Sequence, residues 1–180
     1  MSGSSPHGCR QRGFTVVELM VVIAITAIAV SMAVPSFTTL MAKKRVEGVT
    51  SELSTDLQYA RSEAVSRNLS VRVTFIGTDC YVIHPASVTA SCTTTTNNIK
   101  TVQLVSGSTA SFSPNGSPAL SYIEFDPVRG IAAFSTASTS GSVNVNSSVG
   151  TAQLQAYVST VGRVCIASPS GIAGYPASCP

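Results

Sequence analysis

The chain has 180 residues, with 11 lysines and arginines against 8 aspartates and glutamates, and charged residues make up only 11% of it. Its mean hydropathy is +0.31, so either part of the chain lies in a membrane or its surface carries neutral polar groups. This length allows one domain with an appendage. A formal net charge of +3 excludes a strongly basic nucleic-acid module, and the lack of Trp argues against an aromatic platform for sugars or bases.

Few residues are candidates for catalysis. The two histidines are His7 and His84, and the sequence has none of the common nucleophile, zinc or phosphate-loop motifs. His84 lies in a strand-like run, where a packing or surface role is the usual one. We therefore expect no enzyme, no metal site and no cofactor.

The N-terminal part joins a short polar segment to a long apolar one. Residues 1–13 are mostly polar, and the 21 residues Phe14–Val34 carry a single charge, that of Glu18. As a helix, this apolar run is about 31 Å long, enough to cross the hydrocarbon core of a membrane. The alternative is a secretory signal cut after Ala33, which would release a soluble protein. Such signals usually have a shorter apolar run and no carboxylate near its start.

Glu18 needs a partner, because a carboxylate in the hydrocarbon core costs about 2.5–3.5 kcal/mol on insertion scales. A cut between Gly13 and Phe14 creates an ammonium group one helical turn away, on the same face of the helix. This ammonium, in the same chain or in a neighbouring copy, would supply the partner.

The run Gly13-Phe14-Thr15-Val16-Val17-Glu18 resembles the prepilin signal of type IV pilins and type II secretion pseudopilins. The resemblance implies that a prepilin peptidase cuts after Gly13 on the cytoplasmic side and that the new N-terminal Phe14 is methylated on its amine. It also implies that Glu18 guides docking into a helical filament. Pro35 stands where pilins commonly carry a helix-kinking proline.

The resemblance further implies the cellular location of the chain and its partners. We expect a single-pass protein of the bacterial inner membrane with its C-terminal domain in the periplasm, later incorporated into a pilus or pseudopilus. The implied partners are other pilins or pseudopilins, the prepilin peptidase, an inner-membrane assembly platform and membrane lipid. The sequence does not distinguish a pilus from a type II secretion role.

Periodicity divides the rest of the chain into a helix and strands. Apolar residues recur at steps of three and four from Val46 to Ala64, which predicts an amphipathic helix, and Glu63 and Arg67 stand one turn apart on it. From Asn68 the period changes to two, which predicts strands. The expected organisation is a cleaved leader (1–13), a transmembrane and filament-core helix (14–34), an amphipathic helix (35–67) and a β-rich periplasmic domain (68–180).

One long helix followed by many short strands predicts an α+β fold, here a pilin-like helix packed on antiparallel sheets. A tight connection is expected at residues 126–130. The Ser- and Thr-rich stretches 93–96 and 135–142 are expected to be exposed loops. The expected strands are residues 69–75, 80–83, 101–105, 122–125, 130–135, 153–158 and 163–167.

Two further stretches resemble the GspH/FimT/FimU group of this superfamily: residues 56–64 before the first strand, and Val161-Gly162-Arg163-Val164-Cys165-Ile166 near the end. This resemblance implies a minor subunit, at initiation or at the tip, rather than the main pilin. Some FimT-type members are associated with DNA uptake through a Gly-Arg-x-Arg motif. Here Gly162 and Arg163 match it, but Cys165 stands at the fourth position. DNA capture with Arg163 as a contact is thus the alternative function, although phosphate binding needs clustered Lys and Arg.

The cysteines indicate an oxidising compartment. A cut after Gly13 removes Cys9 and leaves an even number, which suggests two disulfides. Three pairings are open, and the local one closes loops of about 13 and 15 residues, each worth roughly 3 kcal/mol. The spacing lacks a zinc-type pair. The four cysteines are Cys80, Cys92, Cys165 and Cys179.

Overall fold

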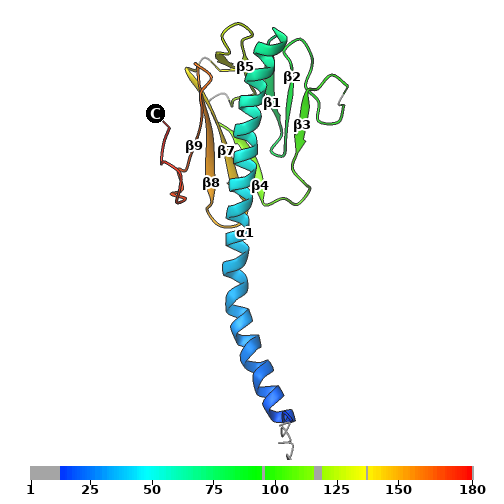
Figure 1. Cartoon of the computed structure of the whole chain (residues 1–180), viewed down its shortest axis with the longest axis vertical. Helices are drawn as coiled ribbons and strands as arrows, with labels where there is room; N and C mark the ends of the chain where they lie inside the picture. The colour runs from blue at the N-terminus through cyan, green and yellow to red at the C-terminus, as the bar shows by residue number, and fades with distance from the viewer. Residues whose placement is uncertain (1–12, 95, 116–118, 137, 180) are drawn as a thin grey trace, which may run out of the picture. The chain divides into compact units, whose positions relative to one another are not determined.

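A computed structural model describes residues 13–94, 96–115, 119–136 and 138–179, so the leader residues 1–12 lie outside it. In the described residues one long helix is followed by nine strands (Figure 1). The elements are α1 (Val16–Arg67), β1 (Val71–Ile76), β2 (Cys80–Pro85), β3 (Lys100–Gln103), β4 (Ala110–Pro114), β5 (Tyr122–Phe125), β6 (Ala132–Phe134), β7 (Ser140–Ser147), β8 (Gln153–Ser159) and β9 (Val164–Ala167).

The chain divides into two compact units, Met1–Phe37 and Thr38–Pro180, and α1 contributes to both. The bounds of α1 include position 35. The kink predicted at Pro35 stays a prediction, because the side chain of that residue lies outside the described residues. The helix ends at Arg67, where Asn68 takes a left-handed conformation with a φ of 52°, as is common just after a helix.

In the second unit α1 buries the stripe that its sequence predicts. The buried side chains are spaced by seven, four, three and four residues and therefore share one face of the helix. Glu63 and Arg67 form the predicted ion pair on the outer side. The residues of the stripe without solvent exposure are Val46, Leu53, Leu57, Ala60 and Ala64.

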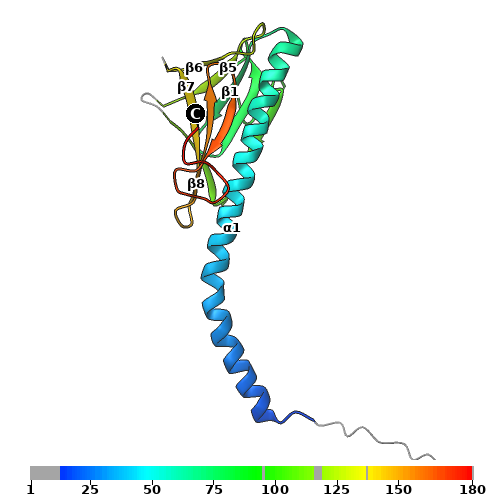
Figure 2. The ribbon, with the colours of Figure 1, turned by 60° about the vertical axis from the view of Figure 1, so that its left-hand side comes forward.

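The strands of this unit form two antiparallel sheets. One has the order β3-β2-β1-β5-β6 and the other the order β4-β7-β8-β9. The part of α1 in this unit lies across both sheets (Figures 1 and 2). Burial alternates along β1, β7 and β8, so each of these strands turns one face to a shared core. The predicted α+β architecture is confirmed.

Three aromatic rings join the two sheets within the core. Phe75 of β1 and Tyr81 of β2 belong to the first sheet, and Phe112 of β4 belongs to the second. The ring centroids of Tyr81 and Phe112 are 5.2 Å apart in an edge-to-face arrangement, a favourable geometry for aromatic pairs. Both sheets and α1 therefore enclose a single hydrophobic core.

Two strands lie where the sequence predicts none. β4 is one, and β7 begins at residue 140, so the loop expected over 135–142 is wrong for its last three residues. The inward positions of β7 include Gly141, where a Cβ would lie 2.5 Å from the ring of Phe134. A neighbouring side chain fills the space that a large residue of β7 would normally occupy, so the strand is poor in the apolar residues by which strands are predicted.

The other predicted strands differ from the observed ones mainly in their ends. β3 covers residues 100–103 rather than 101–105, and β6 covers 132–134 rather than 130–135. The late start of β6 follows from the predicted connection, in which the N–H of Gly130 donates to the carbonyl of Asp126 at 3.0 Å. Gly130 has a φ of 60°, which a strand does not accommodate.

Two disulfides hold the polar loops of the second unit. Cys80 is joined to Cys92, with 6.5 Å between their Cα atoms, and Cys165 to Cys179, with 6.1 Å. This is the local one of the three possible pairings. The first bond ties the loop after β2 back to that strand, which is buried at five of its six positions. The second ties the C-terminal segment to β9.

Non-reducing peptide mapping of the mature protein is expected to find these two links and no free thiol. Replacing Cys165 and Cys179 together by serine should lower the free energy of unfolding by about 3 kcal/mol in the chain-entropy model, measured by urea titration of the detergent-extracted protein. A peptide linking Cys92 to Cys165 would contradict the pairing.

Candidate functional site

The predicted processing residues, Gly13 and Phe14, precede α1 and are separated from it by Thr15 alone. Phe14 is 78% exposed. Among the described residues, no heavy atom lies within 4 Å of the place where a Cβ on Gly13 would be. Nothing in the part of the chain that the structure describes therefore requires glycine at position 13, and a requirement for it would come from a partner that approaches the backbone.

Glu18 has a local role at the start of α1 besides its predicted role in docking. Its backbone N–H donates to Oγ1 of Thr15 at 3.2 Å, so Thr15 is the N-cap and Glu18 the third residue of the helix. This is the Thr-x-x-Glu spacing of a capping box, a local role for Glu18 that is independent of its need for a charged partner. A carboxylate in the first turn also lies at the positive end of the helix dipole.

The helix is apolar around its whole circumference in the first unit. Its most apolar 18-residue window has a mean hydropathy of 2.5 and no buried residue, and among the described residues α1 is the one helix long and apolar enough to cross a membrane. Such a surface fits lipid or other apolar helices. The large exposed side chains of this unit are Phe14, Val16, Val17, Leu19, Met20, Val21, Val22, Ile23, Ile25, Ile28, Val30, Val34 and Phe37.

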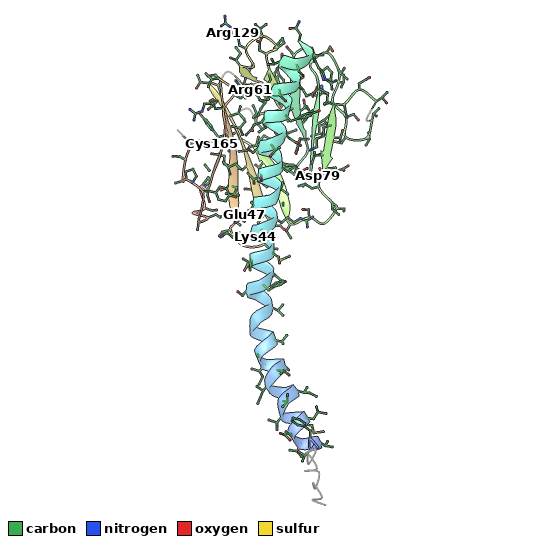
Figure 3. All side chains as sticks on the ribbon, viewed as in Figure 1. Lys44, Glu47, Arg61, Asp79, Arg129 and Cys165 are labelled. Atoms are coloured by element: carbon green, nitrogen blue, oxygen red, sulfur yellow. A yellow bond between two sulfur atoms is a disulfide. The ribbon has the colours of Figure 1, made fainter. Side chains whose placement is uncertain are left out.

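A second candidate region is an open groove of about 530 Å³ beside the last turns of α1. We call it the three-arginine groove, because Arg61 of α1, Arg129 of the β5–β6 turn and Arg163 of the β8–β9 turn line it. Figure 3 shows Arg61 and Arg129 at the end of the domain where α1 ends. Of the three, the sequence singles out Arg163 alone, since the other two lie far from it in the chain.

Two glycines place Arg61 between the turns. Gly130 and Gly162 have φ angles of 60° and 74°, and a Cβ on either would lie 2.9 Å from Nε of Arg61. Nη1 of Arg61 donates to the carbonyl of Gly162 at 3.3 Å. Since Arg129 precedes one glycine and Arg163 follows the other, the packing of Arg61 brings three distant arginines together.

The fourth position of the Gly-Arg-x-Arg motif cannot contribute to this groove as a free side chain. Cys165 occupies it and is bonded to Cys179. The part of the motif that remains, Gly162-Arg163, lies at the groove, with Arg163 exposed to solvent.

His84 is a buried packing residue, the first of the two roles that its sequence context indicates. Its Nδ1 donates to the carbonyl of Pro85 at 2.8 Å, so Nε2 accepts from the hydroxyl of Thr74, also at 2.8 Å. Burial is the largest effect and lowers the pKa of His84; the hydrogen bond to the Pro85 carbonyl raises the pKa by less, and the charge of Arg72 lowers it again. The ring is therefore neutral and fully bonded. The described residues contain no cluster of three acidic, His or Cys side chains that could hold a metal.

Two family models match this chain, one over its N-terminal segment and one over the end of α1 and most of the strands. The model of the type II transport protein GspH matches residues 49–162, and the model of the prokaryotic N-terminal methylation motif matches residues 8–34. No curated protein matches the chain.

Two crystal structures of the type IV minor pilin FimU from Pseudomonas aeruginosa (strain PAO1) have a similar fold. Their TM-scores are 0.53 and 0.52 at 17% and 18% sequence identity. The matches cover 71% and 69% of this chain and 94% and 98% of the FimU chains. Since the GspH model spans more than half of the sequence and a methylation motif precedes it in the chain, the chain belongs to the GspH family of type IV pilins and pseudopilins, structural subunits of a type IV pilus or a type II secretion pseudopilus.

Proposed function

We propose that the chain is a minor subunit that enters its filament through the N-terminal helix and acts at initiation or at the tip. The observation that carries filament entry is an apolar, exposed helix that begins two residues after Phe14 and has Glu18 in its first turn. The minor role is supported by membership of the GspH family and by the likeness to the minor pilin FimU. Before assembly the protein is a single-pass protein of the inner membrane, with the domain of the two sheets in the periplasm. Its partners are other pilins or pseudopilins, the prepilin peptidase, the inner-membrane assembly platform and lipid.

The chemistry of the N-terminus supports this proposal. Cleavage after Gly13 would place the ammonium of Phe14 one turn before Glu18, and a buried carboxylate requires such a partner. The amine of a helix in hydrocarbon has the same requirement. When two such helices pack, the carboxylate of one can pair with the ammonium group of the other. Assembly is therefore more favourable than insertion of a single helix, whose charges lack a neighbour to pair with.

Intact-mass analysis of the membrane-extracted protein is expected to show the loss of residues 1–13 and the gain of one methyl group. Gly13→Leu should slow the cut strongly and Gly13→Ala less, because the peptidase must approach the backbone there while the chain itself leaves the position open. The domain should remain folded in both variants, as judged by its disulfides. An N-terminus at Val34 would instead favour a released, soluble protein.

The placement in the filament is tested by quantitative mass spectrometry of sheared filaments or overexpressed pseudopili. We expect the processed chain to be present and much scarcer than the main subunit. Deletion of its gene should reduce the number of filaments and leave the proportions of the other subunits in the remaining filaments unchanged. Loss of surface pili after deletion would assign it to a pilus, and loss of protein secretion would assign it to a pseudopilus. An amount equal to that of the main subunit would contradict a minor role.

A further inference from the structure

The arginines of the three-arginine groove lack carboxylate partners. Among the described residues, no ion pair includes Arg61, Arg129 or Arg163, and no Asp or Glu lines the groove. The acidic residue of the adjoining turn, Asp126, caps that turn: its Oδ1 accepts hydrogen bonds from the backbone N–H groups of Val128 at 2.9 Å and Arg129 at 3.0 Å. The ion pairs among the described residues of the domain are Lys44–Glu47, Glu63–Arg67, Arg72–Glu124 and those of Lys100 with Glu52 and Asp56.

Exposed aliphatic side chains surround the same arginines. Val128 and Ile131 flank the turn of Arg129 and are 77% and 43% exposed. Val161 precedes Gly162 and is 55% exposed, and Val65 lines the groove itself. Beyond residue 41, these four are most of the large exposed apolar side chains that the described residues contain. Arginines among exposed aliphatic side chains are the composition of a protein interface.

The surface is held in place before any partner arrives. The N–H of Ala132 donates to the carbonyl of Thr160 at 2.8 Å and so joins the two turns. Arg61 packs against both glycines and bonds to one of them. A surface fixed in this way loses little conformational freedom on binding.

We propose that the three-arginine groove and its four aliphatic neighbours, Val65, Val128, Ile131 and Val161, bind an acidic segment of another subunit of the same filament. This inference rests on the proposed function and names the contact by which this subunit recognises its neighbour. Guanidinium groups bind carboxylates through two parallel hydrogen bonds, and the aliphatic side chains bury against the apolar residues around them.

A nucleic acid fits this surface less well. Affinity for a phosphate backbone grows with the number of cations along it, and the groove offers three. A charged phosphodiester chain would not bury the four exposed aliphatic side chains against apolar groups, whereas a protein segment with apolar residues would. The partner is therefore a polypeptide with Asp or Glu side chains next to apolar ones.

The test replaces Val128 by a photoreactive phenylalanine derivative in the full-length chain, in cells that assemble the filament. After irradiation, the cross-linked peptide is identified by mass spectrometry. We expect a segment of another filament subunit that contains Asp or Glu. Arg163→Glu should reduce the cross-link about tenfold, while Arg45→Glu, the same charge change at an exposed residue far along α1, should leave it unchanged.

A charge exchange makes the test specific. Replacing the acidic residue of the cross-linked segment by lysine should restore the cross-link in Arg163→Glu, which a folding defect would not allow. Disulfide mapping of each variant checks its fold independently. A cross-link that survives Arg163→Glu while the chain still enters filaments overturns this inference and leaves the proposed function intact. Absence of the wild-type chain from filaments overturns the proposed function instead.

Binding of a nucleic acid, the competing ligand, is measured in a separate experiment. The purified mature chain is titrated with a short DNA duplex at several salt concentrations. We expect weak binding that Arg163→Glu and Arg45→Glu reduce equally. Tight, salt-dependent binding that only Arg163→Glu removes would identify a nucleic-acid surface and overturn the protein partner.

Discussion

Glu18→Val is expected to enter the membrane as well as the wild type and to be lost from the filament. Removing the charge makes the apolar segment easier to insert, by roughly 2 kcal/mol or more on the insertion scale. The variant loses the partner for a neighbour's ammonium group, and an unpaired charge in hydrocarbon is costly. Position 18 lies in a different compact unit from the sheets, so the domain should fold and form its disulfides normally.

The measurement compares the sheared-filament fraction with the membrane fraction for each variant. Thr15→Ala is the matched control, because it removes the N-cap, worth about 1 kcal/mol, and keeps the carboxylate. It should enter filaments nearly as well as the wild type, which separates the docking role of Glu18 from its role in starting the helix. Equal incorporation of Glu18→Val and the wild type would show that Glu18 has no docking role in this subunit. A subunit at the very tip has no subunit above it. It would therefore pair its charges with a neighbour on one side only.

The elements that the sequence predicts well are those whose own residues carry the periodic signal. The buried stripe of α1 and the alternation in β1 depend on side chains of one segment, so periodicity reveals them. β7 is different, because the ring of Phe134 fills the place beside Gly141. With a glycine at that inward position, only Val143 and Val145 alternate with polar residues along β7, and this pattern is too short to predict the strand.

The same reasoning explains which functional residues were predictable. The processing and docking residues lie within six consecutive positions, so their spacing is visible in the chain. The three-arginine groove combines residues 61, 129 and 163, and what unites them is the packing of Arg61 against two glycines with positive φ. Such a cluster depends on the register of two sheets around a helix, which no local spacing encodes.

A buried polar network joins α1 to the first sheet. The carboxylate of Asp56 on α1 is 5% exposed. It accepts a hydrogen bond from the hydroxyl of Tyr81 at 2.7 Å and one from Nζ of Lys100 at 2.8 Å. Burial of the ring, together with the bond to this carboxylate, raises the pKa of Tyr81 well above its usual value. The hydroxyl therefore stays protonated and acts as a donor at every physiological pH.

Asp56→Ala is expected to lower the free energy of unfolding by about 2–4 kcal/mol, because it leaves the Tyr81 hydroxyl buried without an acceptor and removes the closer of the two carboxylates that pair with Lys100. Asp56→Asn keeps an acceptor for Tyr81 and should cost less. Tyr81→Phe removes the orphaned hydroxyl, so the double variant Asp56→Ala/Tyr81→Phe should lose less stability than the sum of the two single changes. Urea titration of the detergent-extracted mature protein, followed by circular dichroism, measures all four. Strictly additive losses would mean that the side chains of Asp56 and Tyr81 do not stabilise each other.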